Sequence, residues 1–301
     1  MNKSVVRAGY DAKKFVNLHI IPTTGTEVME NKIEKYTYTR SLCMVLYRAV
    51  TLEAPGMTLR VEHSISHGQY CRLLQADGNV VQVARDLAGR LLRRMRLLVD
   101  ADLPFRISVR PKAEAIDIFR KEGLTEKIEL LDTIPGEEVK CYEFDGVLDS
   151  YIGDLADSSG QLRVFDLRMY KEGLLLLGPD PANPAVPVRP VRQAKMYRAF
   201  RQSLEFNKVI RVSCAGELNR VVLNNDTKML INVAEAMHNK LLGRISDEIA
   251  TRHRRGEASL IMLAGPSSSG KTTTCKRLAV QLMTNMMSPK MISLDDYFVN
   301  R

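Results

Sequence analysis

The residues that could do chemistry in this chain are concentrated in one glycine-rich segment. Residues 265–272 match the pattern G-x-x-x-x-G-K-[ST], with Gly265 and Gly270 as the glycines and Lys271 as the cation. A short apolar run at 260–264 comes before it and predicts a buried strand. Apolar side chains at helical spacing follow it and predict a helix: Cys275, Leu278, Ala279, Leu282, Met283 and Met286. A strand, a loop and a helix in that order form the setting in which this pattern binds phosphate.

The loop residues have definable roles toward a nucleotide. Glycine lets the backbone turn tightly with its N–H groups pointing inward, and the helix N-terminus adds partial positive charge. Lys271 would reach the β- and γ-phosphates, and Thr272 would supply a hydroxyl to Mg²⁺. The alternative is a Ser- and Gly-rich loop that happens to precede a helix. We expect ATP with Mg²⁺ to bind nine consecutive residues: Gly265, Pro266, Ser267, Ser268, Ser269, Gly270, Lys271, Thr272 and Thr273.

Two carboxylates follow the next predicted strand, at 290–294. Ligands gather at the carboxyl ends of strands in a parallel sheet, so Asp295 and Asp296 should lie near the phosphates. A carboxylate there could accept a proton from an attacking hydroxyl or hold Mg²⁺ through water, and Asp296 is a candidate for the second role. The alternative is a solvated acidic turn or helix cap.

Together, these motifs resemble the start of a uridine kinase or phosphoribulokinase-type P-loop kinase. More narrowly, the chain is similar to bacterial nucleoside kinases that carry a threonyl-tRNA-synthetase-like region ahead of the kinase domain. The resemblance implies ATP-dependent phosphoryl transfer to a nucleoside such as uridine. Asp295 would then be the catalytic base toward the 5′-hydroxyl and Lys271 the catalytic cation, with Tyr297 and Phe298 at the mouth of the pocket.

The kinase motifs cover only residues 259–301, which amount to one strand-helix-strand unit. A doubly wound domain needs several parallel strands and usually at least ~100–150 residues. We therefore expect the chain to be the amino-terminal part of a longer protein. The lid and the remaining kinase residues would lie beyond residue 301, and this part would be inactive by itself.

Composition places the chain among ordinary globular proteins. Its 301 residues, 45% of them hydrophobic, can support about two domains. No apolar stretch approaches the ~20 residues of a membrane span, so we expect no membrane partner. Charges throughout residues 1–20 argue against a signal peptide. The five cysteines lack C-x-x-C spacing, which favours reduced thiols and a cytoplasmic location. The oligomeric state is left open.

Two histidines, His63 and His67, have the H-x-x-x-H spacing that suits a metal on a helix, but their surroundings predict an extended segment. The segment resembles the H-x-x-x-H of the second domain of threonyl- and alanyl-tRNA synthetases, where mischarged tRNA is hydrolysed. In that family a Cys-x-Gly-x-His motif completes the zinc cluster. The matching stretch here keeps Gly153 but has Tyr151 and Leu155 instead of Cys and His. We therefore expect no zinc and no hydrolase activity.

Strands and helices up to residue 177 follow one another without a regular β-α-β rhythm, which predicts an α+β domain. The resemblance implies that this domain is synthetase-like. The first β-α-β unit of an α/β P-loop kinase domain would come after it. Four regions result: a remnant of a β-grasp-like module at 1–34 with a strand at 15–21, the threonyl-tRNA-synthetase-like domain at 35–177, a proline-rich crossing and helical connector at 178–258, and the kinase start at 259–301.

The net charge of +9 includes one arginine cluster, made of Arg85, Arg90, Arg93, Arg94 and Arg96. A basic face can attract RNA. Leucines interleave with these arginines at helical spacing, however, so we favour an amphipathic helix with an arginine-rich solvated side. Two function classes remain: a nucleoside kinase, and an RNA-binding or nucleotide-sensing regulatory module that uses the synthetase-like domain.

Overall fold

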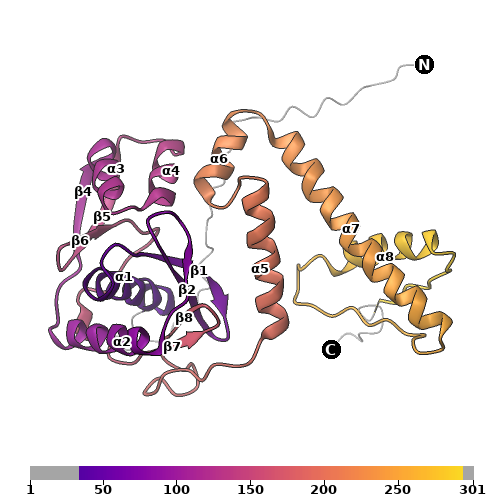
Figure 1. The fold of residues 1–301 in the computed structure, drawn as a ribbon, viewed down its shortest axis with the longest axis horizontal. Helices are drawn as coiled ribbons and strands as arrows, with labels where there is room; N and C mark the ends of the chain where they lie inside the picture. The colour runs from indigo at the N-terminus through magenta and orange to yellow at the C-terminus, as the bar shows by residue number, and fades with distance from the viewer. Residues whose placement is uncertain (1–33, 294–301) are drawn as a thin grey trace, which may run out of the picture.

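The structure is a computed structural model that describes residues 34–293 (Figure 1). The strand expected at 15–21 and the residues Asp295, Asp296, Tyr297 and Phe298 lie outside the described residues.

The first part of the described chain is built around helix α1 (Lys35–Glu53). Its residues 41–50 are buried except Arg48, so the helix is apolar on nearly all sides. Helix α2 (Arg85–Asp100) packs beside it and buries one stripe, of which Leu91 and Met95 are fully enclosed. The helix expected at the arginine cluster is therefore confirmed.

An antiparallel sheet lies against these helices in the order β1-β2-β8-β7, with β3 paired to β2. Its strands are β1 (Thr58–Ile65), β2 (Gly68–Leu74), β3 (Val80–Val81), β7 (Asp166–Tyr170) and β8 (Gly173–Leu177). Ser66 and His67 connect β1 to β2, and both have positive φ, of 56° and 66°. Two such residues form the hairpin turn whose twist matches that of the strands.

A second antiparallel sheet has the order β4-β5-β6 and is accompanied by two short helices. The elements are β4 (Arg106–Pro111), α3 (Lys112–Lys121), α4 (Thr125–Thr133), β5 (Glu138–Phe144) and β6 (Val147–Asp149). One 3-10 turn, Ser159–Gln161, leads back to β7. Small antiparallel sheets with helices confirm the α+β class.

The region expected to be a connector divides into two parts. Helix α5 (Ala194–Val209) packs on the first sheet, where Tyr197 joins an apolar cluster with Tyr70 and Leu175. Helix α6 (Ala215–Leu223) packs on α4 so closely that a Cβ on Gly216 would lie 2.2 Å from the carbonyl carbon of Glu129. Residues up to 223 therefore pack with the body that contains the two sheets.

Helix α7 (Thr227–Arg254) leaves this body and pairs with α8 (Lys271–Thr284) (Figure 1). Leu242 of α7 packs with Leu278 and Leu282 of α8. Within residues 34–293, no helix is both long and apolar enough to cross a membrane.

Candidate functional site

The loop before α8 places its second glycine directly in front of the helix. Gly270 has a φ of 77°, which glycine adopts without steric cost, and the helix begins at the next residue, Lys271. A Cβ on Gly265 would lie 2.8 Å from Ser269 Oγ, closer than real Cβ atoms come. Gly270 is therefore required by its backbone conformation, whereas a Cβ at Gly265 would need only the Ser269 side chain to rotate away.

The first turn of α8 presents donors toward the loop. The first hydrogen bond of the helix runs from the Thr274 N–H to the carbonyl oxygen of Gly270. The N–H groups of Lys271, Thr272 and Thr273 therefore have no acceptor within the helix. Lys271 Nζ donates to the carbonyl oxygen of Pro266 at 2.8 Å, which folds the ammonium group over the loop. A bound phosphate could replace this carbonyl as the partner of Lys271. Thr272 and Thr273 are exposed, as a metal-bound hydroxyl would need to be.

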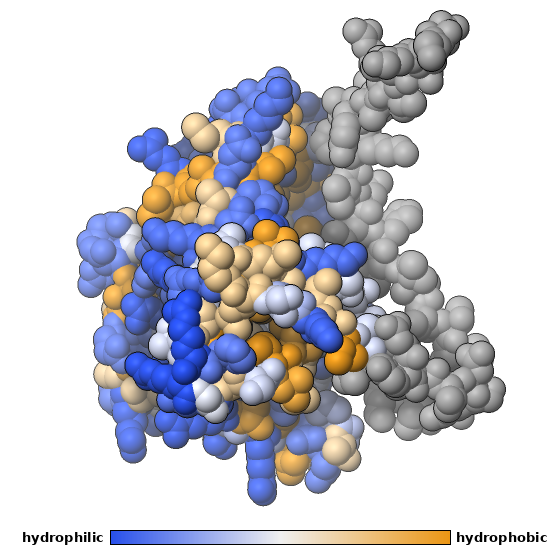
Figure 2. All heavy atoms as spheres, turned by 90° about the vertical axis from the view of Figure 1, so that its right-hand side faces the viewer, coloured by the Kyte–Doolittle hydropathy of each residue, from blue (hydrophilic) through white to orange (hydrophobic). Residues whose placement is uncertain are grey.

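The strands expected on either side of this loop and helix are not formed, so that part of the prediction is wrong for the described residues. Residues 260–264 and 290–293 have no regular structure. Leu260 is 75% exposed and Met262 81% exposed. A strand needs a hydrogen-bonding neighbour, and neither sheet of residues 34–293 contains these segments. Figure 2 views the molecule from this side, where apolar side chains gather at the surface.

His63 and His67 do not form a paired site. His63 lies in β1 and stacks on Phe200 of α5, with ring centroids 3.8 Å apart, whereas His67 is exposed in the hairpin turn. This confirms the extended surroundings expected for the motif. Burial lowers the pKa of His63, an effect that Arg72 reinforces and Glu62 opposes.

The residues at the positions of the missing zinc ligands lie in a different environment. The Tyr151 hydroxyl contacts Met44 Sδ of α1 at 3.8 Å, and Lys127 lies over the Tyr151 ring. Leu155 is buried in the main core. Among residues 34–293, no three His, Cys, Asp or Glu side chains form a group that could hold a metal. Tyr151 and Leu155 therefore contribute to packing in the core around α1.

The arginines of α2 are partly neutralised. Arg90 and Arg94 both pair with Glu53 of α1, and Arg90 also pairs with Asp86. Arg85, Arg93 and Arg96 are exposed. This supports the amphipathic helix that we favour from the sequence.

The sequence analysis missed an ion network on the face of β1 and β2 that meets α4. Glu62 accepts from Arg72 and lies 3.4 Å from Arg60, while Arg60 also pairs with Glu126 of α4. The side chains of Glu62 and Arg72 are only 4% and 9% exposed. Arg60 also donates to the carbonyl oxygen of Ser213, just before α6. The network thus ties α4 and the α5–α6 turn to the sheet. No sequence motif marks it, because its members come from distant segments.

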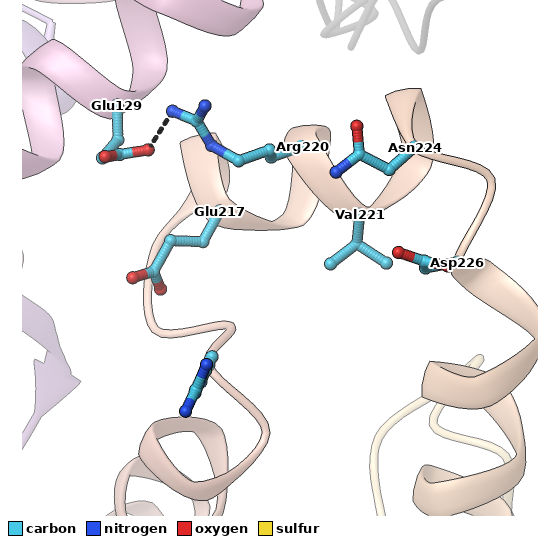
Figure 3. Close-up of a pocket in the computed structure, with 7 residues that line it drawn as sticks. Glu129, Glu217, Arg220, Val221, Asn224 and Asp226 are labelled. Carbon is cyan, nitrogen blue, oxygen red and sulfur yellow. Dashed lines mark hydrogen bonds and ion pairs between the residues drawn. The ribbon is translucent and has the colours of Figure 1, made fainter.

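A polar cavity of about 260 Å³ lies where α4, α6 and the start of α7 meet. Arg220 bridges to Glu129 across it, and Glu217, Asn224 and Asp226 also line it (Figure 3). Its acidic and basic side chains largely compensate one another. The cavity therefore has no strong preference for an anion.

Comparison with known proteins finds partial matches to threonine–tRNA ligases. The protein from Francisella tularensis subsp. novicida (strain U112) is 35% identical over 75 residues, which is 25% of this chain and 12% of that protein. The protein from Hahella chejuensis (strain KCTC 2396) is 33% identical over 79 residues, 26% of this chain and 12% of the ligase. No family model matches the chain. The chain thus matches only about an eighth of the length of these relatives. These matches confirm a threonyl-tRNA-synthetase-like region, and the kinase resemblance stays a prediction.

Proposed function

We propose that this chain carries an RNA-binding module built on its synthetase-like domain. The observation that carries the proposal is the 35% identity over 75 residues to a threonine–tRNA ligase, a protein that by name acts on tRNA. The net charge of +9 agrees with a polyanionic partner, because cations that neutralise phosphates release condensed counterions. We infer binding and not hydrolysis, since Tyr151 and Leu155 stand where the editing cluster would need a thiolate and an imidazole.

Binding of a labelled tRNA transcript, measured as a function of salt, tests this function. The dissociation constant should rise steeply between about 50 and 200 mM salt, as it does when several phosphates are contacted. Absence of measurable binding at the lowest salt would remove the proposal.

A second candidate function is nucleoside phosphorylation, which the loop geometry favours. Two observations support it: Gly270 lies in the left-handed region directly before α8, and Lys271 Nζ lies over the loop at the carbonyl oxygen of Pro266. On this proposal ATP with Mg²⁺ binds at residues 265–273. A nucleoside hydroxyl attacks the γ-phosphorus, its proton passes to Asp295, and ADP leaves. The test is ATP binding and turnover in the full-length protein, compared with the Lys271 and Asp295 variants described below.

A further inference from the structure

A second basic segment, not recognised in the sequence analysis, surrounds the start of α5. Between Asp180 and Glu205 the chain has no acidic residue. Five cations lie in that interval, and we call them the basic ridge: Arg189, Arg192, Lys195, Arg198 and Arg201. Basic residues that cluster along a helix and the segment before it form the kind of surface to which a polyanion is attracted.

All five side chains of the basic ridge are exposed. Arg201 pairs with Glu205 at 3.1 Å, one helical turn away, which is a weak exposed ion pair. In the described part of the chain, the other four have neither an ion pair nor a side-chain hydrogen bond. They differ in this from Arg60, Arg72 and Arg220, which are all paired with carboxylates.

The body of the domain holds the ridge in place. Tyr197 of α5 is buried and donates a hydrogen bond to Glu172, and Phe200 stacks on His63. Just before the helix, Gln193 Oε1 accepts a bond of 2.8 Å from the Ser66 N–H. These contacts orient the apolar side of α5 toward the sheet. The cations therefore project from a backbone that the domain holds in place, and the ordering needed when a ligand binds is mainly that of their side chains.

The chemistry of the ridge favours RNA over a lipid surface. Tyr197 and Phe200 of α5 are used against the sheet, so this apolar side of the helix is not free to insert into a membrane surface. Four of the five cations are arginines, whose planar guanidinium groups can bind phosphate oxygens in pairs. Lys195 and Arg198 lie about one turn apart on the same side of the helix. A row of cations of this kind suits a row of phosphates.

We propose that the basic ridge is the surface on which this domain docks the sugar-phosphate backbone of RNA. This inference rests on the proposed RNA-binding function and adds the location of the site. Because phosphates are contacted, the ridge would set affinity and salt dependence more than sequence preference.

The test compares two triple variants that remove the same charge from different surfaces. The ridge variant is Arg192→Gln, Lys195→Gln, Arg198→Gln. The control is Arg85→Gln, Arg93→Gln, Arg96→Gln on α2, whose three arginines are equally exposed and have no ion pair in the described residues. Affinity for a fluorescent tRNA transcript is measured at several salt concentrations, and circular dichroism checks folding. If the triple ridge variant does not fold, the single variants Lys195→Gln and Arg198→Gln are measured instead.

The ridge variant should bind at least about tenfold more weakly near 100 mM salt. Its plot of log affinity against log salt should be less steep by about 2–3, because each lost phosphate contact changes the slope by ~0.9. The control should stay within about threefold of the wild type. Equal losses of affinity in both variants, or a loss in the control alone, would refute the basic ridge as the binding surface. The proposal that the domain binds RNA would be unaffected. If the wild-type protein shows no measurable RNA binding but binds anionic phospholipid vesicles, both the RNA-binding function and the role of the basic ridge are refuted.

Discussion

The imidazole of His63 lies on the ring of Phe200, with centroids 3.8 Å apart and planes inclined by 26°. The contact joins β1 to α5, two segments that are far apart in the sequence. His63 Nε2 is buried there and has no hydrogen-bond partner among residues 34–293. A histidine that resembles a metal ligand by its spacing therefore helps to attach a helix to the sheet.

Phe200→Ala should lower the free energy of unfolding by about 2 kcal/mol. Full burial of a phenylalanine is worth roughly 3–5 kcal/mol in such substitutions, and Phe200 is only half-buried. Chemical denaturation of the synthetase-like domain measures the change. Met196→Ala on the same helix is the control, because Met196 is 49% exposed and its loss should cost no more than about 0.5 kcal/mol. Equal effects of the two substitutions would contradict the role given to Phe200.

Stability should fall as the pH drops below about 6.5, the ordinary pKa of histidine. Burial lowers the pKa of His63 in the folded protein, so the unfolded chain binds more protons in this range. The contribution is fully present above pH ~6.5 and is lost as the pH falls toward the lower folded pKa. Urea denaturation at several pH values measures it.

His63→Gln should make this pH dependence shallower. His67→Asn is the control, because it removes an imidazole from the exposed turn and asparagine tolerates the positive φ of that position. A pH profile that His63→Gln leaves unchanged would assign the effect to other groups.

If the proposed kinase function is correct, Lys271→Ala should weaken ATP binding or abolish turnover. The substitution removes the charge that would face the β- and γ-phosphates. Titration calorimetry with Mg·ATP measures the loss. Lys276→Ala tests whether any lysine of α8 would behave the same way, since Lys276 is exposed on the same helix one turn further on. Unchanged ATP binding and turnover in Lys271→Ala would refute the assignment of the loop.

Asp295→Asn should reduce nucleoside phosphorylation by ~10²–10⁴-fold while ATP still binds. The amide keeps the shape of the side chain but cannot accept the hydroxyl proton. Steady-state turnover and ATP affinity, measured on the same preparation, separate the two effects. Asp296→Asn is the comparison: a full loss there, with Asp295→Asn near wild type, would transfer the role of base to Asp296.

Protein purified without added zinc should contain well under one equivalent of the metal. Zinc normally keeps three protein ligands in catalytic sites, and His63 and His67 could supply two at most. Elemental analysis gives the stoichiometry. One tightly bound equivalent that disappears in the double variant His63→Ala, His67→Ala would revive the hydrolase alternative.

Local patterns in the sequence determined a good part of the first domain. The leucine spacing around Arg90 and Arg94 predicts α2, because one face of a helix must be apolar to be buried. The G-x-x-x-x-G-K-T pattern likewise predicts the turn at Gly270 and the helix that starts at Lys271. These are short-range features, since the conformations of a few neighbouring residues decide them.

Tertiary structure alone decided what required distant segments to meet. Residues 260–264 have the composition of a strand, yet a strand forms only where a neighbour supplies hydrogen bonds, and none does so in the described residues. The partners of His63 and Glu62 could not be foreseen either, because Phe200 and Glu126 approach only after α5 and α4 pack on the sheet. The exposure of the basic ridge follows from the same docking of α5. Packing decides which charged side chains form ion pairs and which stay unpaired. The order of residues along the chain does not contain this information.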